Sequence, residues 1–144
     1  YFSLTVNATQ IFTWSDTVLL ALTSLLSSNA TGGIGYATGS GGAVTQLTSK
    51  STGVTLNKVC GAITMNNAAL AAAAEVSFTV TNSTVAATDV IERSIASGAT
   101  AGAYSIEIDA IAAGSFRVSV GNRAAGSLSE AIVINFAVLK AVAA

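Results

Sequence analysis

The chain has 144 residues, of which 51% are hydrophobic and 9% charged, with a net charge of −1, no histidine, no proline and one cysteine. A compact domain of this length buries roughly 70% of its unfolded surface, which is enough for a hydrophobic core. Ordinary domains carry about 25% charged residues, so this surface must consist largely of hydroxyls, amides and small side chains. Such a surface suits a protein whose faces contact copies of itself or a lattice.

The residue types present exclude several classes of function. The lysines and arginines are scattered, so the basic patch of a nucleic-acid-binding protein is missing. Without histidine, Ser-His-Asp and Cys-His catalytic arrangements and imidazole metal sites cannot form. The single cysteine, Cys60, cannot form an intrachain disulfide and is expected to be a small buried hydrophobe. We therefore expect a non-enzymatic protein without cofactor or metal.

The first residues are rich in large apolar side chains. Phe2, Leu4 and Val6 alternate with polar residues, and Phe12 and Trp14 follow, which is typical of a strand or an extended arm with an apolar face. These aromatics need a surface to bury against, either the body of the same chain or a neighbouring subunit. Phe2, Phe12 and Trp14 are therefore the candidate interface residues.

Two more features complete an N-terminal segment of residues 1–42. Between Ser15 and Leu26 an N-cap is followed by apolar residues at helical spacing, which predicts a short helix, although a buried strand is the alternative. The apolar run 18–26 is too short to span a bilayer and no charged region precedes it, so we expect neither a membrane helix nor a signal peptide. The glycines of 29–42 do not match a nucleotide-binding loop, and they predict a flexible connection.

Residues 43–144 are expected to form a β-sandwich body. Short runs of alternating apolar and polar residues are separated by turns rich in Gly, Asn, Ser and Ala. The predicted strands are 43–48, 53–58, 60–66, 75–82, 88–95, 103–111, 115–121 and 131–139. This spacing favours an all-β, antiparallel and jelly-roll-like sandwich, with an immunoglobulin-like topology left open. Residues 68–74 could form one helical turn, but a loop is favoured.

The most regular part of the body is 103–138, which predicts three consecutive strands. Each has apolar residues on one face, so we expect a meander whose apolar side the rest of the chain covers. The third of these strands is apolar on both faces. Such a strand is either central in its sheet or covered by another subunit.

Carboxylates are the remaining candidates for chemistry. Glu107 and Asp109 lie two residues apart on one predicted strand, which places them on the same face roughly 6–7 Å apart. Retaining glycosidases use two carboxyl groups about 5–5.5 Å apart, so a catalytic pair is conceivable. The polar face of an amphipathic strand, without a catalytic or calcium-binding role, explains both residues more simply.

Other polar residues have ordinary interpretations. Asp89 and Glu92 are expected to lie on opposite faces of a strand, with Arg93 or Arg117 as the partner of a weak surface ion pair. Glycosylation sequons begin at Asn7, Asn29 and Asn82. A chain so rich in Asn and Thr contains such sequons by chance, so we do not expect glycosylation.

Seven segments of the body carry a family resemblance. They are Ser49–Lys58 (SKSTGVTLNK), Ile63–Leu70 (ITMNNAAL), Val80–Ser83 (VTNS), Ile95–Gly102 (IASGATAG), Ala112–Phe116 (AAGSF), Gly126–Ala131 (GSLSEA) and Asn135–Val138 (NFAV). In these segments the sequence resembles a module that recurs in structural proteins of tailed bacteriophages. The resemblance extends from about Tyr36 to Lys140, and a capsid-specific arm would be expected in residues 1–35.

This resemblance implies a component of the virion. One implied role is a decoration (cement) protein, a dimer or trimer on the outer capsid surface that bridges major capsid protein subunits through Phe2, Phe12, Trp14 and the sandwich edges. The alternative is a head or tail fibre module that attaches to host-surface glycans. Tyr36 or Tyr104 would then form the sugar platform, although the loops contain few other aromatics.

Overall fold

The computed structural model describes residues 31–142, which are all-β and contain no helix. The chain divides into two compact units, Tyr1–Ile34 and Gly35–Ala144, and every strand described below belongs to the second. The strands are β1 (Gly41–Thr45), β2 (Val54–Thr55), β3 (Cys60–Thr64), β4 (Glu75–Thr81), β5 (Val90–Ser97), β6 (Tyr104–Ala112), β7 (Ser115–Asn122) and β8 (Val133–Leu139).

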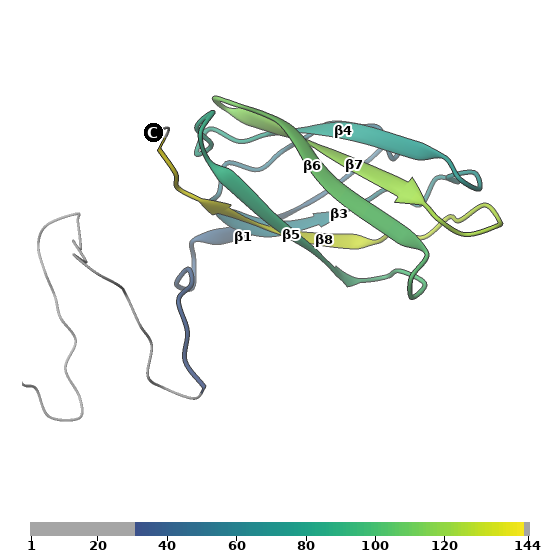
Figure 1. Cartoon of the computed structure of the whole chain (residues 1–144), viewed down its shortest axis with the longest axis horizontal. Helices are drawn as coiled ribbons and strands as arrows, with labels where there is room; N and C mark the ends of the chain where they lie inside the picture. The colour runs from purple at the N-terminus through teal and green to yellow at the C-terminus, as the bar shows by residue number, and fades with distance from the viewer. Residues whose placement is uncertain (1–30, 143–144) are drawn as a thin grey trace, which may run out of the picture. The chain divides into compact units, whose positions relative to one another are not determined.

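The strands form two four-stranded sheets that lie in two layers (Figure 1). Sheet A has the order β1-β3-β8-β5, and sheet B has the order β2-β4-β7-β6. The β1–β3 and β2–β4 pairs are parallel and the other pairs are antiparallel. A purely antiparallel sandwich was therefore the wrong expectation. Between each parallel pair the chain crosses to the opposite sheet and back, so it re-enters the first sheet in its original direction.

The predicted meander over 103–138 is only partly present. β6 and β7 form an antiparallel hairpin in sheet B, but β8 lies in sheet A, between β3 and β5. The chain reaches β8 through residues 123–132. Within this segment Leu128 forms an isolated antiparallel bridge with Leu70. Because β8 is apolar on both faces, a central position in the other sheet satisfies it better than the edge of a meander.

Every predicted strand in the described residues has a counterpart, although several boundaries differ. β1 begins at Gly41, within the Gly-rich stretch, and β2 contains only two residues. Residues 68–74 contain no helical turn. They end in a β-turn in which the Ala74 amide donates to the Ala71 carbonyl at 3.2 Å, with Ala73 at a φ of 56°.

The core lies between the inward rows of the two sheets. Ile63 and Ile134 of sheet A and Val120 of sheet B are fully buried. The Phe116 and Phe136 rings join the sheets with centroids 5.4 Å apart at an interplanar angle of 57°. Burial of each such side chain stabilises the fold by roughly 1.5–3 kcal/mol, and aromatic pairs in tilted contact add to this. The core is therefore built from the apolar rows that the two-residue period identifies.

The connections between strands are held by buried amide side chains. The Asn122 Nδ2 donates to the carbonyl oxygens of Leu70 at 2.9 Å, Ala71 at 3.0 Å and Gly126 at 2.9 Å. Its Oδ1 accepts from the Ala124 amide at 2.8 Å. Asn122 is 3% exposed, so it replaces water as the partner of these loop backbone groups.

Asn82 plays the same part after β4. Its Nδ2 donates to the Lys58 carbonyl at 2.7 Å, and its Oδ1 accepts from the amide and the hydroxyl of Thr84 at 3.0 and 2.7 Å. The side chain is fully buried. The amide nitrogen of this sequon is therefore held inside the folded body.

Candidate functional site

The predicted interface residues Phe2, Phe12 and Trp14 lie outside the described residues, as does the helix predicted for 15–26. Their role as an interface stays a prediction. The described surface of the body consists of the outward faces of sheets A and B and the loops at the two ends.

The outward face of sheet B carries the carboxylates singled out in the sequence. Glu107 and Asp109 both point outward from β6, but each lies beside a guanidinium. The Asp109 Oδ1 is 2.5 Å from the Arg117 Nε, and the Glu107 Oε2 is 3.4 Å from an Arg93 terminal nitrogen. The Arg117 side chain holds the pKa of Asp109 below its ordinary value. The two carboxylates are thus engaged in separate ion pairs rather than directed at one point.

These contacts correct the expected ion pairs. Arg93 and Arg117 pair with Glu107 and Asp109, not with Asp89 or Glu92. The partner of Asp89 is Lys140, whose ammonium nitrogen lies 2.7 Å from a carboxylate oxygen. That carboxylate also accepts from the Ala86 amide at 2.8 Å, and its side chain is 1% exposed. Lys140 lies just beyond β8 and Asp89 just before β5, so the contact joins two neighbouring strands of sheet A.

Three other singled-out residues have clear positions. Tyr104 is buried at 9% exposure, so of the two tyrosines named for a sugar platform it does not offer its ring to the surface. Tyr36 is 43% exposed, and its hydroxyl donates to the Val138 carbonyl. Cys60 is half-buried rather than fully buried, because it points outward from β3.

A buried polar cluster at one end of the sandwich was not identifiable from the sequence. The Lys50 Nζ donates to the carbonyl oxygens of Asn66 and Glu130, both at 2.6 Å, although Lys50 is only 4% exposed. Burial lowers the pKa of Lys50, and the nearby Glu130 carboxylate partly offsets this effect. The Gln46 amide donates to the Lys50 and Thr52 carbonyls at 3.0 and 2.8 Å. These contacts fasten the loop after β1 to the segments that follow β3 and precede β8.

Glu130 extends this cluster toward the β5–β6 connection. Its Oε1 accepts from the Thr100 hydroxyl at 2.7 Å, which holds the pKa of Glu130 below its ordinary value. Its Oε2 and the Tyr104 hydroxyl are buried without a hydrogen bond of ordinary geometry in the described part of the chain. Burial raises the pKa of Tyr104. No sequence signal joins Lys50 to Glu130, because the two are far apart in the chain and each is flanked by turn residues.

The outward faces of the two sheets differ in chemistry. Sheet B presents hydroxyls and charges, with outward residues Glu75, Ser77, Thr79, Thr81, Ser105, Glu107, Asp109, Ser115, Arg117 and Ser119. Sheet A presents small and apolar side chains, with outward residues Ala43, Thr45, Cys60, Ala62, Thr64, Val90, Glu92, Ser94, Val133, Asn135, Ala137 and Leu139. Within these outward rows of sheet A the one charged residue is Glu92.

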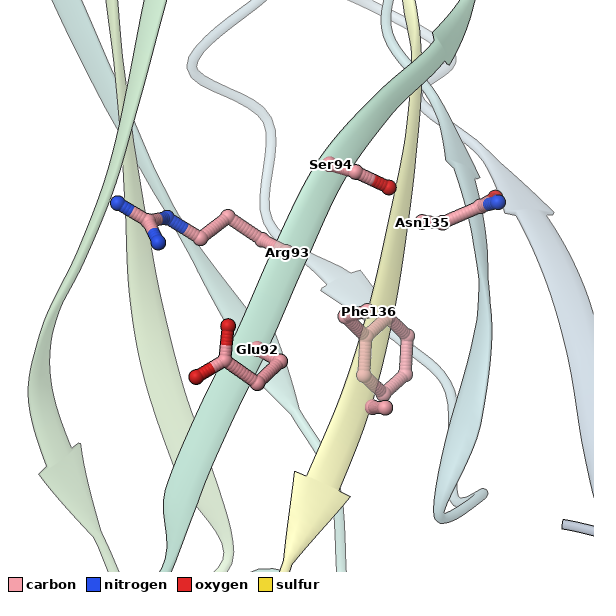
Figure 2. A pocket seen from close by; sticks show the side chains of 6 residues that line it. Glu92, Arg93, Ser94, Asn135 and Phe136 are labelled. Atoms are coloured by element: carbon pink, nitrogen blue, oxygen red, sulfur yellow. The ribbon is translucent and has the colours of Figure 1, made fainter. Parts of the chain in front are cut away.

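The face of sheet A carries an open hollow of about 190 Å³ over the paired strands β5 and β8 (Figure 2). Its lining residues are Glu92, Arg93, Ser94, Asn135, Phe136 and Ala137. The register places Glu92 opposite Ala137 and Ser94 opposite Asn135, so these four share the outward face. Figure 2 shows Arg93 pointing to the opposite side of β5 from Ser94, in keeping with its ion pair to Glu107. The hollow is therefore bounded by a carboxylate, a hydroxyl and an amide around a small side chain.

Residues 31–142 contain no group of three or more Asp, Glu or Cys side chains that could hold a metal ion. The same range has no helix with the length and hydropathy needed to cross a bilayer. No protein-family model, curated protein or solved structure matches this chain.

Proposed function

We propose that this chain is a capsid decoration protein that binds the outside of a phage head and bridges major capsid protein subunits. The resemblance to structural modules of tailed bacteriophages suggests this role. The structural observation that supports this proposal is the outward face of sheet A, which consists mainly of small side chains and is nearly uncharged. Such a face loses little when it is desolvated against another protein.

The architecture is consistent with a protein that works as a stabilising clamp. Apart from β6 and β7, consecutive strands lie in opposite sheets, an alternation that supports a jelly-roll-like description. The segments that carry the resemblance include Lys50, Asn66 and Asn82, which fasten the loops. Binding across capsomer boundaries would stabilise the assembled shell by mass action, with the protein present as a dimer or trimer on symmetry positions.

The test is a cryo-electron microscopy map of virions that contain this chain. We expect density on the outer shell at capsomer junctions, in contact with the major capsid protein. Heads stripped of the chain should rupture at a lower temperature, and added protein should restore the original temperature. Density on a projecting fibre, or stripped heads as heat-resistant as decorated ones, would remove the decoration hypothesis.

The N-terminal aromatics give a matched pair of variants. Phe12→Ala combined with Trp14→Ala should reduce head occupancy at least tenfold, because aromatic anchors dominate interface energies. The control is Leu47→Ala, which removes an 85% exposed apolar side chain from the body and should leave occupancy unchanged. Equal binding by both variants would show that the arm is not the anchor.

A further inference from the structure

Each sheet has two edge strands, and three of these four edges carry features that oppose pairing with a further strand. β2 is only two residues long. β5 and β6 contain charged residues, and the pairing of each with its neighbour has a register shift. The ion pair of Arg93 with Glu107 also links these two edges across the sandwich. Short length, charge and bulges are the usual means by which proteins protect open edges.

β1 has none of these features. It has five residues, GGAVT, none of which is charged, and all five keep a regular register with Cys60–Thr64 of β3. On its other side β1 has no hydrogen-bonded neighbour among the described strands. Lys58 passes beside Gly42, but its Nζ donates to the Gly39 carbonyl at 3.4 Å, so the charge lies before the strand begins. Within residues 31–142, β1 is therefore the unprotected edge.

The hydrogen bond that follows β1 shows which of its backbone groups are free. The Gln46 amide donates to the Thr64 carbonyl at 2.9 Å, so it points toward β3. Because the peptide groups of successive residues point to alternate sides of a strand, those of Gly41, Ala43 and Thr45 point to the open edge. Each of these three residues presents one N–H donor and one C=O acceptor there.

We propose that a second copy of this chain pairs with this edge, β1 against β1, antiparallel about a two-fold axis at Ala43. Ala43 then lies opposite Ala43 of the second copy, and Gly41 lies opposite Thr45. Opposed residues of this kind exchange two hydrogen bonds, so the free groups of all three residues are paired. The two copies of sheet A become one continuous sheet, with both outward faces on the same side.

The side chains of β1 are complementary to one another in this register. On the inward face each Val44 lies opposite Gly42 of the second copy, and on the outward face each Thr45 lies opposite Gly41, so each larger residue meets a glycine. Val44 is half-buried in the single chain, and the pairing covers it further. No charge meets its own copy at the axis, whereas the same operation on β6 would oppose carboxylates. These matches favour a second copy over an unrelated strand.

This inference extends the proposed function, because it gives an interface to the dimer named there. It sets the two outward faces of sheet A side by side, so one dimer presents twice the small-residue surface. A contact centred on five residues of each chain is smaller than a standard interface, so we expect a Kd of about 10 µM. The test is made in solution without heads, so failure of this inference and failure of the decoration role are separate results.

The first experiment is sedimentation velocity of the full chain at concentrations from about 1 to about 200 µM, where we expect a monomer–dimer equilibrium. Ala43→Pro removes an amide that faces the open edge and keeps the hydrogen bonds to β3, since proline is tolerated where the amide faces solvent. It should weaken dimerisation at least tenfold, and circular dichroism verifies that the variant is folded. The control, Phe12→Ala with Trp14→Ala, should dimerise as the unaltered chain does.

The second experiment is a disulfide cross-link at the axis, in a Cys60→Ala background that removes the native thiol. The Cα atoms of a directly opposed hydrogen-bonded pair lie about 5.5 Å apart, which a disulfide can span. Ala43→Cys should therefore cross-link two chains under mild oxidation at least ten times faster than Glu92→Cys. That control places a thiol on the same face of sheet A but on the opposite edge strand, β5.

The inference is overturned if the unaltered chain stays monomeric at about 200 µM, which is the result expected if another segment or another protein covers β1. It is also overturned if folded Ala43→Pro dimerises unchanged, or if the variant at Phe12 and Trp14 is monomeric. Equal cross-linking rates at Ala43 and Glu92 would overturn it as well. If Ala43→Pro does not fold, the cross-linking rates decide.

Discussion

Lys50 illustrates how much a single buried polar residue can contribute to this fold. Its ammonium donates to two loop carbonyls at 2.6 Å, in a region where water cannot replace it. Lys50→Met removes both hydrogen bonds and leaves the carbonyl oxygens of Asn66 and Glu130 without the ammonium donor. We expect the free energy of unfolding in urea to fall by about 3 kcal/mol.

Arg123→Met is the control for that substitution. Arg123 is exposed, and its side chain makes no hydrogen bond or ion pair within residues 31–142. The free energy of unfolding should change by less than about 0.5 kcal/mol. If both variants lost the same stability, the loss would reflect charge removal in general rather than the loop contacts of Lys50.

Ala73 gives a prediction in which a substitution increases the free energy of unfolding. Its φ of 56° lies in the left-handed region, where a Cβ is unfavourable and glycine is not. Ala73→Gly relieves this strain but adds conformational freedom to the unfolded chain. We therefore expect the free energy of unfolding in urea to rise by about 0.5 kcal/mol. The backbone of the neighbouring Ala72 is not in this region. Ala72→Gly should therefore lower the free energy of unfolding by about 0.5 kcal/mol. Destabilisation by both substitutions would contradict the strain at Ala73.

Between elements, the contact of Asp89 with Lys140 makes stability depend on acid pH. The Ala86 amide and the Lys140 ammonium hold the pKa of Asp89 below its ordinary value of 3.8. The folded state therefore binds this proton more weakly than the unfolded state does. The resulting stabilisation is complete above the unfolded pKa and is lost as pH falls through the folded one.

We therefore expect urea unfolding to be independent of pH between about pH 5 and 8, since the chain has no histidine, and stability to fall below about pH 4. Asp89→Asn should reduce the acid dependence, and Asp109 and Glu130, whose pKa values are also lowered, should supply what remains. Glu92→Gln, which alters an exposed carboxylate, is the matched control. An unchanged acid profile in the Asp89→Asn variant would disprove the contribution of this ion pair.

Strand existence was predictable from the sequence, and strand partners were not. The alternation in β6 and β7 correctly predicted two strands. The two apolar rows of β8 predicted either a central strand or one covered by another subunit, and β8 lies centrally in sheet A. Alternation is a local property, whereas pairing depends on which sheet a connection enters. The parallel β1–β3 and β2–β4 pairs and the transfer of β8 to sheet A follow from such crossings.

At the scale of the molecule, the same limit applies to the candidate sites. Glu92 and Asn135 are 43 positions apart in the numbering, and only the β5–β8 register brings them to one hollow. Lys50 and Glu130 looked like scattered charges for the same reason. The carboxylates of β6 could be placed on one face from their spacing, but their arginine partners come from β5 and β7.

The composition and the topology together predict the refolding kinetics of the whole molecule. The chain has no proline, so no prolyl isomerisation can delay refolding. Sandwiches built from distant strands fold in milliseconds to seconds. When unfolded protein is diluted from urea, the far-ultraviolet circular dichroism signal should recover within seconds, with no phase of tens of seconds. Acceleration by a prolyl isomerase would contradict this.

The central position of β8 also affects how the protein is made. β1, β3 and β5 leave the ribosome before β8, which is Val133–Leu139. In sheet A, β5 pairs only with β8, and β3 pairs only with β1 and β8. A nascent chain that lacks β8 exposes the edges of β3 and β5 and the inner face of sheet B. Completion of the body is therefore delayed until Val133–Leu139 has been synthesised, and until then the unpaired strand edges are open to aggregation.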